Sequence, residues 1–202
     1  MDSFFEKVGK AWPPGRRDLH WHVLPTEEEA AILAAPYREI TAPGLHRVPL
    51  GGMHCTLLHA VGLGRSDIAV DELLQDVRRA AETMQPFALT FDRPSVGAVA
   101  VELSGWPGAP FTALVDQVTG AMNRTKVTFR AAPSRYPHIS LGYTGDGADA
   151  LDAVALRTAI ASIDGPVSGT VLADRIHLVE QWHDGRHILF TPIAEIPLGA
   201  RA

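Results

Sequence analysis

The chain has 202 residues, a formal net charge of -5 and 46% hydrophobic residues, which is typical of one folded domain and argues against a disordered or coiled-coil protein. The negative charge disfavours a broad electrostatic clamp on nucleic acid. Charges in the first twenty residues argue against a signal peptide, and no later apolar run could span a bilayer. The single cysteine, Cys55, excludes an internal disulfide and a cysteine-based metal cluster. We expect a cytoplasmic monomer with no membrane attachment.

The first half of the chain alternates strands with amphipathic helices. Asp18–Leu24 alternates and is rich in strand formers, and Thr26 with Glu29 forms a capping box that opens a helix ending near Pro36. Apolar residues recur at intervals of three and four over residues 68–84, which predicts a helix with one buried face. The other segments predicted in this half are strands at residues 45–50, 53–61, 87–91 and 96–103 and a helix at residues 111–122.

The second half repeats this order of elements. We predict strands at residues 127–129 and 137–143, a helix at residues 148–163, and a hairpin of strands at residues 171–181 and 187–193. Asp184-Gly185 is a dipeptide typical of a type I′ hairpin turn. The chain therefore reads as a mixed α+β protein with two similar halves. We expect one bilobal domain over residues 18–198, preceded by an N-terminal extension at residues 1–17.

A short motif occurs once in each half: H-C-T-L begins at His54, and H-I-S-L begins at His138. Because side chains alternate along a strand, His54 shares a face with Thr56, and His138 shares a face with Ser140. About 0.1 such matches are expected by chance in this composition. One copy alone would be read as an ordinary hydrogen-bonded strand histidine, whereas the pair indicates a functional site.

The chemistry that needs two such motifs is displacement at phosphorus. One group must deprotonate the attacking oxygen while another protonates the leaving oxygen. Two imidazoles, each with an ordinary pKa of about 6.5, can take these opposite roles near neutral pH. Hydroxyls such as those of Thr56 and Ser140 would donate to the non-bridging phosphate oxygens. The sequence thus predicts His54 and His138 as a catalytic pair.

The two motifs and their flanks resemble the two-histidine phosphoesterase superfamily, in particular its bacterial 2′-5′ RNA ligase-like branch. The resemblance runs from D-L-H-W-H-V-L-P through V-P-L-G-G-M-H-C-T-L to R-Y-P-H-I-S-L-G-Y and the closing hairpin. Cys55 occupies a variable position, and Ser140 is an allowed alternative to Thr. Arg135 and Tyr136 depart from the Arg-Pro-His sequence that is common before the second motif in the ligase branch.

This resemblance implies a bilobal fold with a pseudo-twofold axis, in which two antiparallel sheets line a central cleft and the helices lie outside. Members typically open 2′,3′-cyclic phosphates, often leaving a 2′-phosphate, and some join RNA ends through a 2′-5′ linkage. They use neither a metal nor a nucleotide cofactor. The resemblance also implies that His138 activates the water and that His54 protonates the leaving oxygen.

Four further residues are candidates for substrate contact. His20 and His22 share one strand face beside the expected cleft, although a structural role is the alternative. Tyr143 lies five residues after His138, so strict alternation places it on the opposite face unless the strand bends. Arg135 is suited to bidentate phosphate recognition, although exposed loop arginines are common.

Charge and histidine clusters give two further expectations. Residues 117–145 contain no Asp or Glu but do contain basic residues, which would favour a small anion: Arg124, Lys126, Arg130 and Arg135. A second group, His177, His183 and His187, straddles the predicted turn and lacks the spacing of a zinc site, so we expect no metal there.

We therefore expect a metal-independent hydrolase of cyclic phosphates on nucleotides or RNA termini. A 2′-5′ RNA ligase is the alternative in the same fold, but ligation requires a long basic groove that a net charge of -5 disfavours. A binding module without turnover is the alternative from a different class. The intact His54, Thr56, His138 and Ser140 argue against it.

Overall fold

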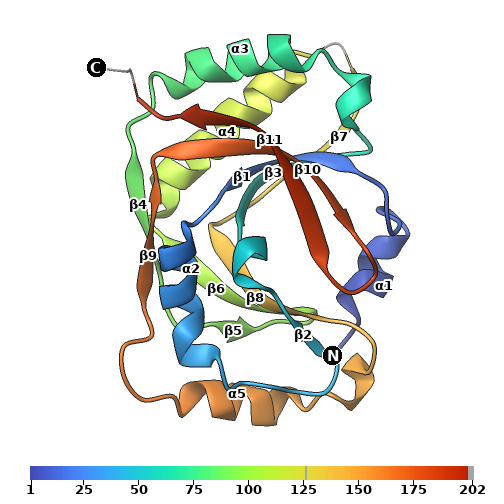
Figure 1. The fold of residues 1–202 in the computed structure, drawn as a ribbon, viewed down its shortest axis with the longest axis vertical. Coiled ribbons are helices and arrows are strands. Elements are labelled where there is room, and N and C mark those ends of the chain that lie inside the picture. Colours follow the sequence, from blue (N-terminus) through green and yellow to red (C-terminus); the bar gives the residue numbers. More distant parts are fainter. Residues whose placement is uncertain (126, 200–202) are drawn as a thin grey trace.

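Two antiparallel sheets form the centre of the computed structural model, which describes residues 1–125 and 127–199 (Figure 1). The first sheet has the strand order β11 (Ile188–Pro197), β10 (Arg175–His183), β1 (Asp18–Val23), β3 (Cys55–Val61), β7 (Arg130–Pro133). The second has the order β2 (Leu45–Arg47), β8 (His138–Thr144), β6 (Ala100–Trp106), β4 (Phe87–Phe91), β9 (Gly169–Ala173), and β5 (Ser95–Val96) also pairs with β6. Each sheet takes strands from both halves of the chain.

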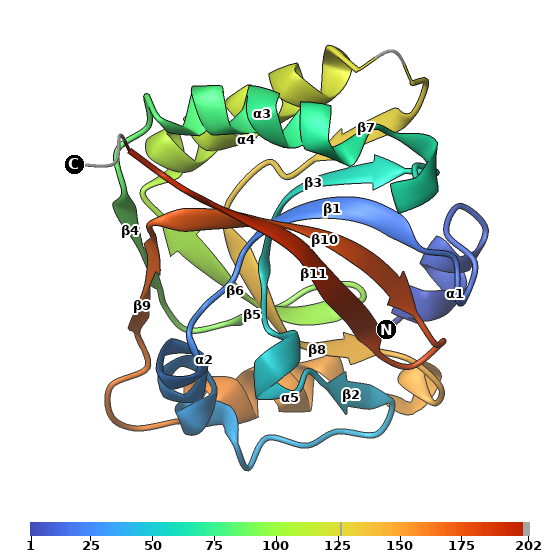
Figure 2. The ribbon, with the colours of Figure 1, turned by 45° about the horizontal axis from the view of Figure 1, so that its top comes forward.

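The helices lie outside the sheets (Figures 1 and 2). One pair, α3 (Val70–Ala81) and α4 (Gly108–Asn123), packs together against the first sheet. Two others, α2 (Glu27–Ala34) and α5 (Ala153–Ala161), lie at the opposite end beside strands of the second sheet. In the described residues no helix has the length and apolar character needed to cross a membrane. The expected α+β fold with two antiparallel sheets and outer helices is confirmed.

Local sequence explains several element boundaries. The capping box predicted at Thr26 and Glu29 is present at the start of α2, with bonds in both directions between the two residues. The predicted helix at residues 68–84 becomes α3, which buries Leu73, Leu74 and Val77 on one face. The carboxylate of Asp152 caps the backbone N–H groups of Val154 and Ala155, so α5 starts later than residue 148, and residues 148–150 form a separate 3₁₀ turn.

Several other predicted strands are wrong or incomplete. The strand predicted at residues 96–103 is a hairpin, because β5 ends at Val96 and pairs with the start of β6. The strand predicted at residues 127–129 is instead β7 at Arg130–Pro133. The strand predicted at residues 171–181 is two strands, because the chain passes from the second sheet to the first at Asp174. The strand predicted at residues 45–50 ends at Arg47, and Leu50–Gly52 forms a 3₁₀ turn.

The turn of the β10–β11 hairpin also differs from the prediction. A type I′ turn needs a positive φ at both central residues, but only Gly185 has one, at +92°. Asp184 instead stabilises a wider loop, since its carboxylate accepts hydrogen bonds from the backbone N–H groups of Arg186 and His187.

The first seventeen residues contain a helix that the sequence patterns did not predict, α1 (Phe4–Gly9). Phe5 of this helix forms a small apolar cluster with Trp12 and Ile188. Its neighbour Phe4 packs on Tyr143 of β8, with ring centroids 4.5 Å apart. The N-terminal segment thus connects the second sheet to the β10–β11 hairpin of the first.

Candidate active site

The two motifs lie at the centre of the molecule, one in each sheet. The first motif runs into β3, between β1 and β7, and the second lies in β8, between β2 and β6. Residues of β3 and β8 contact one another across the two sheets. The backbone of His138 also lies within hydrogen-bonding distance of the Cys55 thiol, whose pKa burial raises to about 12. The fold therefore brings the two halves of the sequence pattern together.

Both motif histidines are held in the same way by the backbone two residues before them. His54 Nδ1 lies 2.7 Å from the carbonyl oxygen of Gly52, and His138 Nδ1 lies 3.1 Å from that of Tyr136. A carbonyl only accepts, so each Nδ1 carries the proton and donates it. This leaves Nε2 of each ring as the nitrogen available for proton transfer.

A β-bulge follows each motif at the same position. Across β1 and β3, His22 pairs with Thr56 while Trp21 pairs with Leu58, so Leu57 is an extra residue. Across β6 and β8, Glu102 pairs with Ser140 while Val101 pairs with Gly142, so Leu141 is an extra residue. In each strand, therefore, side chains beyond the extra residue point to the opposite face from the one that simple alternation would give them.

The bulges decide which later residues share the face of the motifs. His59 pairs with His20, and His20 lies on the same face of β1 as His22, so His59 shares the face of Thr56. By the same reasoning Tyr143, which pairs with Ala100, shares the face of Ser140. The bulge is therefore the irregularity in the strand that brings Tyr143 to the face of the motif. Its hydroxyl is within hydrogen-bonding distance of Ser140, and burial raises the pKa of Tyr143 to about 12.

Burial strongly perturbs the first motif histidine. His54 is 8% exposed, and its burial lowers its pKa from 6.5 to about 4, against the opposing effect of the bond to Gly52. The positive form of His138 adds to the lowering, which indicates that the two imidazoles are close enough to interact. His138 itself is only partly buried. At neutral pH His54 is therefore a neutral imidazole in the free protein.

His22 lies directly against His54. The two rings are stacked, with centroids 4.4 Å apart and an interplanar angle of 20°. His22 is 0% exposed and His20 is 3% exposed, and neither nitrogen of either ring has a hydrogen-bond partner among the described residues. Burial lowers the pKa of both rings well below 6.5. His22 therefore contacts a motif histidine, whereas direct contact of His20 and His22 with substrate stays a prediction.

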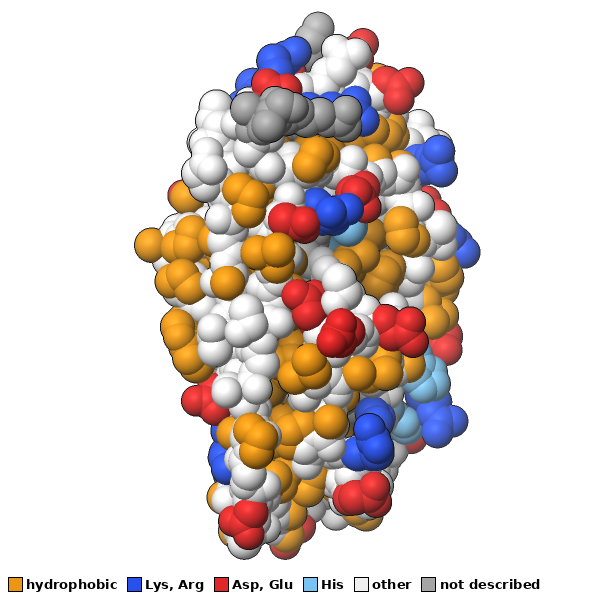
Figure 3. Space-filling view, turned by 60° about the vertical axis from the view of Figure 1, so that its left-hand side comes forward, with side chains coloured by type: hydrophobic (Ala, Val, Ile, Leu, Met, Phe, Trp, Pro, Cys, Tyr) orange, Lys and Arg blue, Asp and Glu red, His pale blue; other side chains and the backbone are white. Residues whose placement is uncertain are grey.

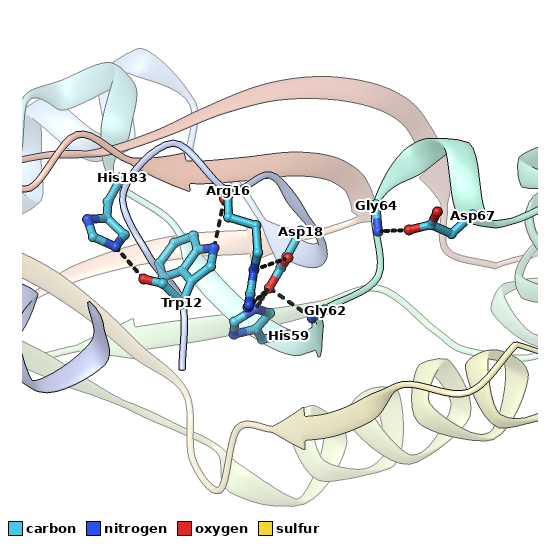
Figure 4. Close-up of polar contacts among 8 residues, drawn as sticks. All are labelled: Trp12, Arg16, Asp18, His59, Gly62, Gly64, Asp67 and His183. Carbon is cyan, nitrogen blue, oxygen red and sulfur yellow. Dashed lines mark hydrogen bonds and ion pairs between the residues drawn. The ribbon is translucent and has the colours of Figure 1, made fainter. Parts of the chain in front are cut away.

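Neighbouring rings form a row of four histidines that ends at a buried carboxylate, Asp18: His54, His22, His20 and His59. Figure 4 shows the contact between His59 and Asp18. The ring of His20 stacks on that of His59 at 3.9 Å, and His59 Nε2 donates to Asp18 at 2.8 Å. Asp18 also accepts hydrogen bonds from Arg16 and from the backbone N–H of Gly62. Burial raises the pKa of Asp18, but these bonds outweigh it and leave the pKa below its ordinary value. An ionised Asp18 thus anchors the far end of this row.

The described basic residues of the 117–145 segment, Arg124, Arg130 and Arg135, do not form one patch. Arg124 lies on the outer helices, 3.6 Å from Asp76 of α3, and Lys126 lies outside the described residues. Arg135 is exposed and sits next to Ser134, whose backbone N–H bonds to Leu57 in the first motif. Arg130 pairs with Val61 at the end of β3 away from the motif, so Arg135 is the described member of this group that lies nearest the motif along the backbone. Phosphate binding by Arg135 stays a prediction.

An apolar cavity of about 320 Å³ lies on the other side of β8. Its walls include Leu45, Leu141 and Ile160, and it does not contain the motif histidines. Because Leu141 is the bulged residue and points away from Ser140, the cavity is separate from the face that carries the motifs. Within residues 1–125 and 127–199, no three His, Cys, Asp or Glu side chains are grouped so as to hold a metal ion.

Two sheets that each carry one H-x-[ST] strand, in contact with each other, are the arrangement expected of the two-histidine phosphoesterase superfamily. The sequence model of the 2′-5′ RNA ligase superfamily matches residues 26–185. The chain belongs to this superfamily. A comparison with curated proteins finds no match.

Solved structures agree on the fold. E. coli LigT in complex with 3′-AMP is 18% identical, with a TM-score of 0.63 over 91% of this chain and 98% of its own. A structure described as a phosphoesterase is also 18% identical, with a TM-score of 0.65 over 91% of this chain and 99% of its own. The protein TT0787 of Thermus thermophilus is 16% identical, with a TM-score of 0.61 over 91% of this chain and 100% of its own.

Proposed function

We propose that this protein is a metal-independent phosphoesterase that opens 2′,3′-cyclic phosphates on nucleotides or RNA termini, with residues 18–198 as its single catalytic domain. The observation that carries the proposal is the matched pair of imidazoles, His54 and His138, each oriented by a backbone carbonyl so that Nε2 is available. Membership in the 2′-5′ RNA ligase superfamily supports it. A monomeric state and a cytoplasmic location belong to the same proposal.

In the proposed reaction a water oxygen attacks phosphorus, and the bond from phosphorus to the ribose 3′ oxygen breaks, leaving a 2′-phosphate. One imidazole takes a proton from the water, and the other gives a proton to the 3′ oxygen. Thr56 and Ser140 donate hydrogen bonds to the phosphate oxygens. In this proposal Tyr143 orients the hydroxyl of Ser140, and Arg135 adds a positive charge beside the phosphate.

The environment of His54 favours one assignment of these roles. The resemblance implies that His138 is the base, but the pKa of about 4 makes His54 a neutral proton acceptor across the physiological range. We therefore propose the reverse assignment, in which His54 takes the proton of the water and His138 protonates the leaving oxygen. His22, stacked beneath His54, would hold the ring of the base in place.

Hydrolysis is preferred to RNA joining. Two RNA ends would need an extended basic surface, whereas the chain carries a net charge of -5. On the face drawn in Figure 3, acidic and basic side chains are scattered among hydrophobic ones without a large basic patch. A small cyclic phosphate does not need an extended basic surface.

The proposal is tested by incubating the purified protein with 2′,3′-cyclic nucleotides and with 2′-5′-linked oligonucleotides, with and without EDTA. We expect cyclic nucleotides to be converted to 2′-phosphates at the same rate in EDTA. Loss of turnover on chelation, with recovery in a divalent ion, would replace the two-histidine scheme by a metal-activated water. Joining of RNA ends as the main reaction would favour the ligase alternative.

The assignment of His54 as base predicts the acidic side of the pH profile. kcat/KM reports groups of the free enzyme, and a base with a pKa of about 4 stays deprotonated well below neutrality. We expect kcat/KM to show no loss of the base between pH 7 and pH 5.5. Circular dichroism at each pH controls for unfolding. A loss of kcat/KM on acidification with an apparent pKa near 6.5 would contradict this assignment.

A further inference from the structure

One carboxylate lies on the same sheet face as the second motif. Glu102 of β6 is directly opposite Ser140 of β8, so the two side chains project from the same face of the sheet. The charge of Glu102 also contributes to the raised pKa of Tyr143, which places the carboxylate near the Tyr143 hydroxyl. The sequence patterns did not single out Glu102, because nothing in its own strand marks it.

Glu102 accepts a hydrogen bond from a neutral hydroxyl but makes no ion pair with the described residues. The hydroxyl of Tyr136 donates to Glu102 Oε1 at 2.5 Å, and this bond raises the pKa of Tyr136 to about 12. Tyr136 and Tyr143 are therefore neutral donors at physiological pH. Within the described part of the chain, no Lys, Arg or His lies within ion-pair distance of Glu102.

We propose that Glu102 makes the site selective for singly charged phosphodiesters over doubly charged phosphomonoesters, and thereby speeds departure of the 2′-phosphate product. This inference rests on the proposed function and deepens it. Opening the cyclic diester turns a monoanion into a monoester whose second pKa is about 6, so the product is mainly a dianion at neutral pH. A fixed negative charge beside the phosphate opposes the product more than the substrate.

The size of the effect follows from the charges. Electrostatic free energy is proportional to the charge of the ligand, so a dianion is opposed twice as strongly as a monoanion at the same position. Removal of the charge should therefore change the affinity for the dianion by about the square of the factor found for the monoanion. A threefold gain for the cyclic substrate would accompany a gain of about ninefold for the product.

The test uses Glu102→Gln, which removes the charge but keeps an oxygen that can accept the hydrogen bond of Tyr136. KM is measured with adenosine 2′,3′-cyclic phosphate, and the inhibition constant with adenosine 2′-phosphate at pH 8. We expect the inhibition constant of the product to fall by about tenfold and KM by about threefold or less. Tyr136→Phe, which keeps the carboxylate, should preserve the wild-type ratio of these two constants.

Two controls isolate the charge of Glu102. Glu72→Gln, on the exposed side of α3, makes the same change in net charge and should leave both constants unchanged. At pH 5.5 the product is mainly a monoanion, so the difference between Glu102→Gln and wild type should shrink to that seen for the substrate. Equal changes for substrate and product at pH 8, or none for either, would overturn the inference.

Failure of the proposed function would be seen separately. If wild-type protein converts no cyclic phosphate, that proposal falls, and the same two ligands are then compared by isothermal titration calorimetry. A tighter 2′-phosphate complex in Glu102→Gln than in wild type, with a smaller gain for the cyclic diester, would still support charge selection. Binding of neither ligand to either protein would reject both ideas.

Discussion

Replacing either motif histidine by alanine is expected to lower kcat by about 10²-fold or more, because each variant loses one of the two proton transfers. Thr56→Val and Ser140→Ala should cost less, since each removes one of several donors to the phosphate. The double variant of His54 and His138 should be little worse than the poorer single variant, as residues that act in one step are not additive. Initial rates with a 2′,3′-cyclic nucleotide measure all of these.

Loss of packing must be distinguished from loss of chemistry, because His54 is buried. His54→Asn keeps a side-chain N–H near the position of Nδ1 for the bond to Gly52 but removes Nε2, so it should fold and remain inactive. His187→Ala, on the hairpin loop and 39% exposed at its side chain, is a matched histidine control that should keep wild-type activity. Near-normal rates in His54→Asn or His138→Ala would rule out the catalytic pair.

A second large effect is expected on stability in acid. His20, His22 and His54 stay neutral in the folded protein below their ordinary pKa of 6.5, because burial lowers all three pKa values. The unfolded chain takes up these protons as the pH falls below about 6.5, and the folded protein does not. Protonation therefore favours the unfolded state, and stability that is complete above pH 6.5 is lost on acidification.

The unfolding free energy is expected to depend steeply on pH. Each histidine that stays neutral only when folded removes about 1.4 kcal/mol of unfolding free energy per pH unit, or about 4 kcal/mol for the three. The contribution of His54 ends near pH 4, where its folded form also takes up a proton. Between pH 6.5 and pH 5 this slope removes about 6 kcal/mol, and by pH 4 it removes about 10 kcal/mol. A protein whose unfolding free energy at neutral pH is about 6 to 10 kcal/mol is therefore expected to unfold between about pH 5 and pH 4.

Urea titrations from pH 8 to pH 5 measure this slope. His22→Leu should reduce it by about a third and should raise stability at pH 7, since two buried nitrogens without partners are removed. The same variant should lower kcat if His22 holds the ring of His54 in place. His187→Gln changes an exposed histidine and should leave the slope unchanged. A stability that is flat between pH 7 and pH 5 would contradict the buried neutral state of these rings.

The sequence predicted the parts of the fold that depend on short-range pattern. The capping box at Thr26 and the buried face of α3 involve residues three or four apart, so each can be predicted from the sequence of a single helix. The H-x-[ST] pairs are likewise local, and their placement in the two sheets follows from the matching order of elements.

Features that depend on partner strands could not be predicted in this way. The passage of the chain between sheets at Asp174 follows from pairing of β9 with β4, which lies some eighty residues earlier. Glu102 comes to the motif face only through its pairing with Ser140. The stacking of His22 on His54 likewise arises from the register of β1 on β3. The alternation of side chains within one strand does not show which strand will pair with it or in which register.

The bulges at Leu57 and Leu141 also govern how these strands tolerate a change of length. Loss of Leu57 would restore simple alternation and keep His59 on the face of Thr56, because the two residues would then lie two positions apart. Loss of Leu141 would likewise keep Tyr143 on the face of Ser140 in the other sheet. A single-residue deletion at these positions would thus remove the bulge without inverting the strand, whereas a deletion within a regularly alternating segment would turn over the residues that follow it.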